Sequence, residues 1–149
     1  MKILIAVDDS PHSERAVEFV TRMRWPAGSR VIVVTACHPA VAAVTAIYPG
    51  AMSLPLESFQ EQRRKAQAVV DRAQGLLRRA GFATEGRIVE GDPRECLMRV
   101  VQDLSVDLLV MGSHGRGALG RALMGSLSSH AVTHIPCSVL VVKHPSGIC

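Results

Sequence analysis

Residues 2–11 read Lys-Ile-Leu-Ile-Ala-Val-Asp-Asp-Ser-Pro, and this stretch holds a strand, a turn and the start of a helix. The run Lys2–Val7 is almost continuously apolar, which is typical of a parallel strand covered on both faces. After the acidic turn, Ser10 predicts an N-cap and Pro11 the first helical residue, where a missing N–H is not needed. A buried strand that leads directly into a helix indicates an α/β fold.

The rest of the chain repeats this alternation. Further strands are expected at residues 30–36, 82–89, 107–111 and 138–142. The intervening helices are expected to begin at Pro11, Pro55, Pro93 and Ser126. The alternation predicts a single domain, residues 1–149, built as an open, doubly wound sheet of five parallel strands with helices on both faces.

Two local expectations accompany this fold. The first helix is expected to bury a stripe formed by Ala16, Val17, Val20 and Met23, and to end at Pro26 and Gly28. Residues 37–54 show no clear period, so we expect a mobile loop over one face of the sheet.

Composition is that of a soluble globular protein, with 149 residues, 48% hydrophobic and 20% charged. The apolar runs are too short to span a bilayer, and the N-terminus reaches an acidic pair too early for a signal peptide. We therefore expect a cytoplasmic protein with no membrane partner. Cysteines 37, 96, 137 and 149 lack CxxC spacing, which predicts reduced thiols.

Charge is distributed unevenly along the chain. The last acidic residue is Asp107, whereas the segment after it contains Arg116, Arg121, Lys143 and several histidines. A local positive potential attracts anions, so the C-terminal third is the expected binding region. This bias alone does not separate a nucleotide from a nucleic acid.

Residues 112–126 read Gly-Ser-His-Gly-Arg-Gly-Ala-Leu-Gly-Arg-Ala-Leu-Met-Gly-Ser. Glycines let the backbone approach a ligand closely or adopt positive φ, and successive N–H groups then form a concave anion site. Ser126 begins a predicted helix, whose N-terminus adds N–H donors and a partial positive charge. The loop therefore predicts a phosphate site.

Three motifs compete for this loop. The phosphate loop GxxxxGK[ST] fails because Ala118 stands at the lysine position. The dinucleotide fingerprint GxGxxG matches at Gly115, Gly117 and Gly120, but the acid expected about 20 residues later is missing. The third pattern is G-x2-G-x9-G-[ST], and Gly112, Gly115 and Gly125-Ser126 fill every fixed position.

This third pattern is similar to the nucleotide-binding signature of the universal stress protein family. The resemblance covers essentially the whole chain. It includes the opening Ile-Ala-Val-Asp-Asp-Ser, Gly91-Asp92-Pro93, the segment that starts at Asp107, and the closing Ile135-Pro136-Cys137-Ser138 followed by Val-Leu-Val-Val.

The resemblance implies a fold of the adenine nucleotide alpha hydrolase type with strand order 3-2-1-4-5, and ATP, with or without Mg2+, between the first and fourth strands. It places Asp8 at the ribose or adenine end and Ala36, where the family often has valine, in the adenine pocket. The residues it implies for the rest of the site are Met111, Gly112, His114, Gly115, Arg116, Gly125, Ser126 and Leu127. It also implies a homodimer through the last strand, Ser138 to Val142.

Asp8 has a simpler interpretation as an acid that stabilises the first helical turn. Asp9 is expected to do this instead, which leaves Asp8 for the ligand. His130 and His134 lie four residues apart, as zinc ligands can, but a surface and core role is favoured for them and for Cys137.

Three functions remain open at this point. The first is an adenine nucleotide-binding regulatory protein, the second a weak ATPase or phosphotransfer enzyme, and the third an interaction protein that leaves its pocket empty. Phosphoryl transfer needs magnesium held by carboxylates and a group that orients the nucleophile, and only Asp8 and Asp9 are expected near the loop. We therefore favour binding over turnover, and we do not expect a nucleic acid partner.

Overall fold

The computed structural model of the chain describes residues 1–37, 56–115 and 124–143. Its elements in chain order are β1 (Lys2–Ala6), α1 (Pro11–Arg22), β2 (Arg30–Cys37), α3 (Leu56–Arg79), β3 (Ala83–Glu90), α4 (Pro93–Leu104), β4 (Leu108–Gly112), α5 (Ser126–His134) and β5 (Ser138–Val142). The predicted alternation of strands and helices is confirmed. The loop predicted at 37–54 lies outside the described residues except for Cys37, which is instead the last residue of β2.

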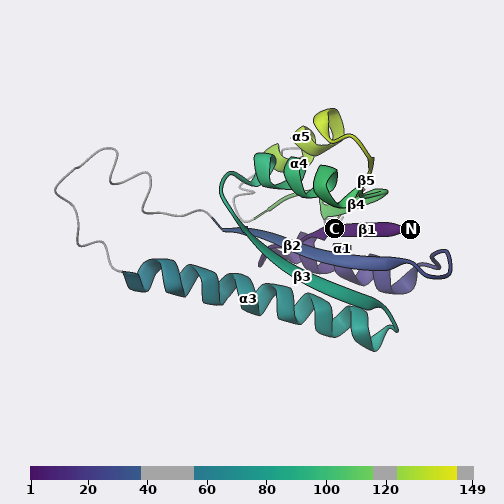
Figure 1. Ribbon diagram of the computed structural model, residues 1–149, viewed down its shortest axis with the longest axis horizontal. Helices are drawn as coiled ribbons and strands as arrows, with labels where there is room; N and C mark the ends of the chain where they lie inside the picture. The colour runs from purple at the N-terminus through teal and green to yellow at the C-terminus, as the bar shows by residue number, and fades with distance from the viewer. Residues whose placement is uncertain (38–55, 116–123, 144–149) are drawn as a thin grey trace, which may run out of the picture.

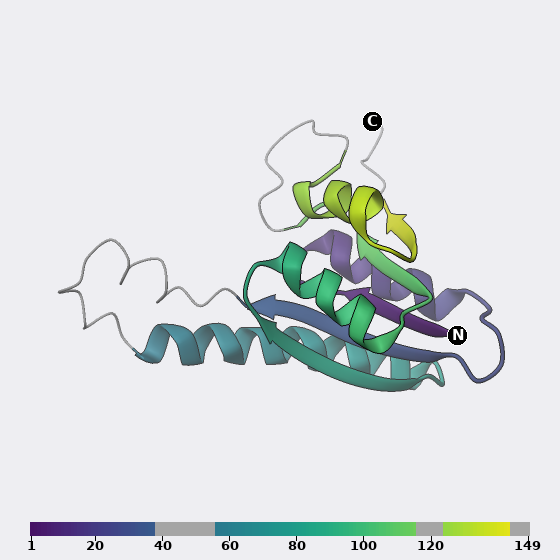
Figure 2. The same ribbon diagram turned by 45° about the horizontal axis from the view of Figure 1, so that its top comes forward.

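The five strands form one parallel sheet with the order β3-β2-β1-β4-β5, as expected (Figures 1 and 2). β1 lies in the centre, so Ile5 pairs with Val33 of β2 on one side and with Val110 of β4 on the other. The chain moves outward from β1 to β3 and then returns across β1 to β4. The strand order therefore reverses between β1 and β4, which is where open α/β sheets bind ligands.

Helices cover both faces of the sheet (Figure 2). Ile3 and Ile5 of β1 point into a core shared with α1 and α3, whereas Leu4 points into a second core shared with α4 and α5. All three side chains are fully buried. Burial on both faces explains why β1 reads as a continuous apolar run and not as an alternating one.

The helix caps follow the local sequence. Ser10 is in extended conformation and its hydroxyl accepts a hydrogen bond from the Ser13 N–H, with Pro11 as the first helical residue of α1. Asp92 caps α4 in the same way by accepting from the N–H groups of Arg94 and Glu95. Both caps satisfy N–H groups that have no partner within the helix.

The prediction that Met23 belongs to the buried stripe of α1 is wrong. The helix ends at Arg22, and Met23 is an extended C-cap residue that is 47% exposed. Trp25 packs against the core at this end of the helix, and its indole Nε1 donates to the Val20 carbonyl oxygen at 2.9 Å. Trp25, and not Met23, is therefore the residue that packs against the core just beyond the end of α1.

None of the helices in the described ranges is long and apolar enough to cross a bilayer.

Gly86 lies where α3 packs closely on β3. A Cβ atom at this position would lie 2.5 Å from Val70 Cγ1 and 2.7 Å from the Gln74 side-chain amide. Val70 is buried and β-branched, so it has little freedom to move away. The absence of a side chain at residue 86 therefore sets the distance between the helix and the sheet.

We expect Gly86→Ala to lower the free energy of unfolding by about 1–3 kcal/mol, because the added methyl group overpacks the contact between α3 and β3. Urea denaturation followed by circular dichroism measures this change. Gly75→Ala is the matched control, since its Cβ would meet only the Arg79 guanidinium at 3.7 Å. That substitution in a helix is expected to stabilise by about 1 kcal/mol. Equal stability of the two variants would contradict the packing argument.

Candidate functional site

The carboxyl ends of β1 and β4 meet at one edge of the sheet, where Ala6 pairs with Met111. A cleft of about 800 Å³ opens at this edge. Its lining includes nine residues predicted for the site, Asp8, Ala36, Met111, Gly112, His114, Gly115, Gly125, Ser126 and Leu127. The tenth, Arg116, lies outside the described residues. The sheet topology thus brings residues from distant parts of the chain into one cleft.

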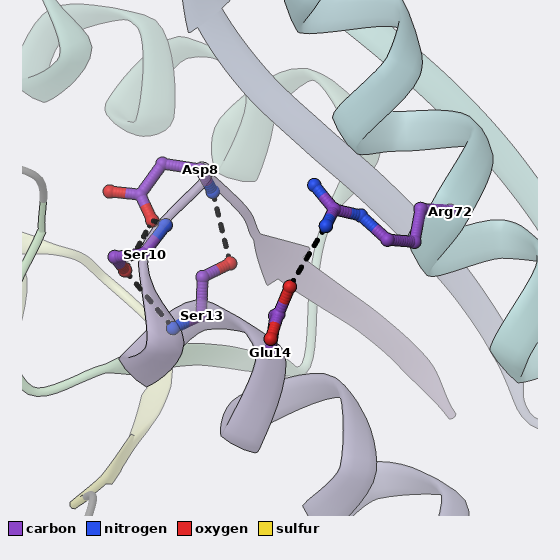
Figure 3. Close-up of polar contacts among 5 residues, drawn as sticks. All are labelled: Asp8, Ser10, Ser13, Glu14 and Arg72. Atoms are coloured by element: carbon purple, nitrogen blue, oxygen red, sulfur yellow. Dashed lines mark hydrogen bonds and ion pairs between the residues drawn. The ribbon is translucent and has the colours of Figure 1, made fainter.

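Asp8 forms the turn between β1 and α1 (Figure 3). Its Oδ1 accepts hydrogen bonds from the backbone N–H and the hydroxyl of Ser10, and its own N–H donates to Ser13 Oγ at 3.0 Å. Its other oxygen, Oδ2, would lie 2.9 Å from a Cβ atom on Gly115. Asp8 therefore holds the turn that leads into α1 through Oδ1, and its Oδ2 lies beside Gly115.

Gly112 has a packing role that the signature did not predict. A Cβ atom here would lie 2.6 Å from the carbonyl carbon of His12 and 2.7 Å from its oxygen. These are backbone atoms of the first turn of α1, so they cannot rotate away. A glycine at the end of β4 allows α1 to begin directly beside the cleft.

Ser113 and Gly125 bring the two ends of the glycine loop together. The Gly125 N–H donates to the Ser113 carbonyl oxygen at 2.7 Å, and the buried Ser128 hydroxyl donates to the same oxygen at 2.8 Å. A Cβ atom on Gly125 would lie 3.2 Å from that oxygen.

The backbone conformation of the signature glycines shows why glycine is needed at these positions. Positive φ values occur at Gly28, Gly81 and Gly91 and not at Gly112, Gly115 or Gly125. We expected close approach or positive φ in the loop, and for these three residues close approach is the constraint.

The N-terminus of α5 faces the cleft without a side-chain cap. The N-cap residue is Gly125, which has no side chain that could cap the helix. The first helical hydrogen bond runs from the Ser129 N–H to the Gly125 carbonyl oxygen. The N–H groups of the first turn, Ser126 to Ser128, consequently have no partner within the helix. Such a terminus offers donors and a partial positive charge to an anion.

Sequence reasoning missed the part of the lining that comes from α3 and α4. α3 contributes Gln62, Lys65 and Ala66, and α4 contributes Pro93, Cys96 and Leu97. Among the described residues of this lining, Lys65 contributes a positive charge and Asp8 is the acidic side chain. Apart from Pro93, which belongs to the Gly91-Asp92-Pro93 stretch of the family resemblance, no motif marks these positions. They enter the cleft through the way the helices pack against the sheet.

Cys96 lies at the wall of the cleft but is only 2% exposed. Burial raises the pKa of the Cys96 thiol above its ordinary value, although the nearby Arg99 guanidinium acts in the opposite direction. The thiol donates weakly to the Glu90 carbonyl oxygen, 3.5 Å from Sγ. Cys37, Cys96 and Cys137 form no disulfide in the part of the chain that the structure describes.

The described residues contain no group of three or more histidine, cysteine or acidic side chains arranged to hold a metal. His130 and His134 stack on the surface of α5 with ring centroids 4.4 Å apart.

Comparison with known proteins identifies the family. Residues 1–143 match the universal stress protein family. A universal stress protein of Thermus aquaticus is 30% identical over 141 residues, covering 95% of this chain and 97% of that protein. The solved structure of the protein MJ0577 of Methanocaldococcus jannaschii superposes with a TM-score of 0.83 at 26% identity, covering 98% and 97% of the two chains.

Three further solved structures share the fold. They are universal stress proteins in complex with cAMP, with dAMP (from Archaeoglobus fulgidus) and with AMP (from Arabidopsis thaliana). Their TM-scores are 0.65, 0.67 and 0.67, their identities to this chain are 24%, 19% and 18%, and each alignment covers at least 94% of both chains.

We expect Cys96 to react with iodoacetamide at pH 7.5 about tenfold or more slowly in the folded chain than in urea, because the thiolate is the nucleophile and burial disfavours it. The rate should rise with pH, since the raised pKa leaves the thiol protonated over a wider range. Peptide mass spectrometry measures each cysteine separately. Equal rates in folded and unfolded chains would show that the thiol is not protected.

Proposed function

This chain belongs to the universal stress protein family, and from that premise we propose that its cleft binds an adenine nucleotide, with ATP as the expected ligand. The uncapped N-terminus of α5 beside the closed glycine loop carries this proposal. Backbone N–H groups at a helix N-terminus are suited to phosphate. The AMP, dAMP and cAMP complexes of structural neighbours support an adenine nucleotide as the ligand class.

In this proposal the phosphates lie against Gly115, Gly125 and Ser126, with His114, Arg116 and Leu127 as neighbours. The base extends toward Ala36, Met111 and Gly112, and Asp8 contacts the ribose or adenine end. The hydrogen bond from Gly125 to Ser113 supports this arrangement, because it holds the start of α5 beside Ser113 and His114. Residues of α3 and α4 complete the lining of the same cleft.

We further propose a regulatory, cytoplasmic role in the stress response, based on binding and not on turnover. Phosphoryl transfer needs magnesium held by carboxylates. In the described part of the cleft Asp8 is the acidic side chain, and its Oδ1 is already hydrogen-bonded to Ser10. Any Mg2+ would therefore be held mainly by the triphosphate, with Asp8 Oδ2 as its protein neighbour.

Isothermal titration calorimetry with AMP, ADP and ATP tests the proposed ligand. We expect saturable binding to the wild-type chain and at least about tenfold weaker binding to Gly115→Val, a loss of about 1.4 kcal/mol. The reason is steric, since even a Cβ atom at residue 115 would lie 2.9 Å from Asp8 Oδ2. Gly75→Ala, far from the cleft, should bind like the wild type.

Two results would contradict the proposal. No binding at millimolar concentrations of any adenine nucleotide would exclude the ligand class. Steady release of ADP from ATP and Mg2+, above that of a Gly125→Val control, would show that the protein is an ATPase.

The edge of the sheet at β5 supports a homodimer. β5 pairs with β4 on one side, and Val139 to Val142 are only half-buried within one chain. Exposed strand edges of this kind readily pair with another chain. We propose that two copies associate through Ser138–Val142.

Sedimentation equilibrium tests this association. We expect a mass of twice the 16.0 kDa of one chain, because pairing would cover the apolar residues of β5. A mass of one chain at tens of micromolar protein would contradict the dimer.

A further inference from the structure

A buried serine lies between two histidines at the edge of the proposed phosphate site. Ser113 Oγ is 3.3 Å from His12 Nδ1 and 3.1 Å from His114 Nδ1. The two imidazole rings, one from α1 and one from the segment after β4, have centroids 5.0 Å apart. His114 lines the cleft, whereas Ser113 is only 2% exposed.

The position of the Ser113 hydroxyl is set by its backbone. The Ser113 N–H donates to the Val142 carbonyl oxygen of β5 at 2.9 Å, and its own carbonyl oxygen accepts from Gly125 and Ser128. With both backbone groups engaged, the backbone of Ser113 is fixed, and the burial of the residue keeps its hydroxyl out of solvent. The same bonds that close the glycine loop thus hold this hydroxyl in place.

His12 reaches Ser113 because of Gly112. The first turn of α1 packs so closely on Gly112 that a Cβ atom there would lie 2.8 Å from His12 Cβ. The N-cap at Ser10 and Pro11 at the first helical position start the helix at this point. The packing of α1 on β4 therefore brings together three side chains that lie up to 102 positions apart in sequence, from His12 to His114.

Counting protons restricts the arrangement. The Ser113 hydroxyl has one proton to donate, and each neutral imidazole carries one N–H and one lone pair. If the hydroxyl donates to His114 Nδ1, then His12 Nδ1–H donates to Ser113 Oγ, and His114 carries its proton on Nε2. In the opposite polarity, His114 Nδ1–H donates to Oγ, and Nε2 bears a lone pair.

These two polarities differ in what His114 offers to a ligand. An Nε2–H is a hydrogen-bond donor, which a phosphate oxygen accepts, whereas an Nε2 lone pair repels the same oxygen. We propose that His12, Ser113 and His114 form a polarised relay, a chain of hydrogen bonds with one direction. His12 Nδ1–H donates to Ser113 Oγ, and the Ser113 hydroxyl donates to His114 Nδ1. The His114 proton is thereby kept on Nε2, from which it donates to the nucleotide phosphate. This inference rests on the proposed function.

The three residues have different roles in this relay. His114 contacts the phosphate. His12 and Ser113 are positioning residues, because they act only through the tautomer of His114. The hydrogen bond made by the other ring nitrogen determines which nitrogen of a histidine is protonated. Adenosine lacks a phosphate and should therefore bind independently of the relay.

Nitrogen-15 NMR of the imidazole groups tests the tautomer directly. Spectra are recorded at pH 8, above the ordinary histidine pKa of about 6.5, with and without AMP. We expect AMP-bound protein to show His114 protonated on Nε2 and His12 on Nδ1. In Ser113→Ala, the His114 tautomer should no longer be held in this form. A His114 proton on Nδ1 in the AMP complex would overturn the relay.

Binding measurements separate the relay from a structural effect. Ser113→Ala and His12→Leu should each weaken AMP binding about fivefold to tenfold, the value of one lost hydrogen bond, and change adenosine binding less than about twofold. His12→Gln retains an N–H donor and should recover much of the lost AMP affinity. His134→Gln, on the surface of α5, is the matched control and should leave both affinities unchanged.

The outcomes are distinguishable. If the wild-type chain binds none of AMP, ADP and ATP, the proposed function fails and the relay falls with it. If AMP binds and the Ser113 and His12 variants lose adenosine and AMP affinity equally, their role is structural and the relay alone is overturned. A selective loss for AMP together with the Nε2–H tautomer would establish it.

Discussion

The pairing of β1 with β4 is the contact on which the rest of the molecule depends. β1 is buried on both faces and bonded to neighbours on both edges, so its carboxyl end is held rigidly at the centre of the sheet. The strand order reverses at this pair, so the helices α1 and α5, which follow β1 and β4, lie on opposite faces of the sheet and leave a gap at the strand ends. The cleft, the turn at Asp8 and the described ends of the glycine loop all lie at this gap.

Glycine residues, which have no Cβ atom, determine how closely the elements approach this gap. Gly112 allows α1 to begin against the end of β4, and Gly125 allows the loop to close on the Ser113 carbonyl oxygen. Gly115 leaves space for Asp8 Oδ2. At each of these positions, a Cβ atom would lie too close to the backbone or to a side chain of the site. The signature pattern is therefore a packing requirement of the fold, in addition to the role proposed for it in ligand binding.

Polar groups around the cleft are connected and not isolated. Asp8, Ser10 and Ser13 hold the start of α1, and the Arg72–Glu14 ion pair joins that helix to α3 (Figure 3). This pair is exposed and contributes at most about 1 kcal/mol. Ser113 links β5, the loop and the two histidines. The start of α1 and the ends of the proposed phosphate loop consequently belong to one hydrogen-bonded unit.

Much of this architecture was predictable from local sequence. The signals for the strands, the helix starts and the glycine loop each extend over only a few residues, so they could be recognised without coordinates. They are the continuous apolar runs, the caps at Ser10 and Asp92, and the spacing of Gly112, Gly115 and Gly125. Met23 shows the limit of this approach, because a helical period cannot reveal that Trp25 occupies the adjoining part of the core. The tertiary structure alone decided that α3 contributes Lys65 to the cleft and that His12 meets Ser113 and His114. These contacts depend on how helices pack against a twisted sheet, and that geometry is a property of the whole chain.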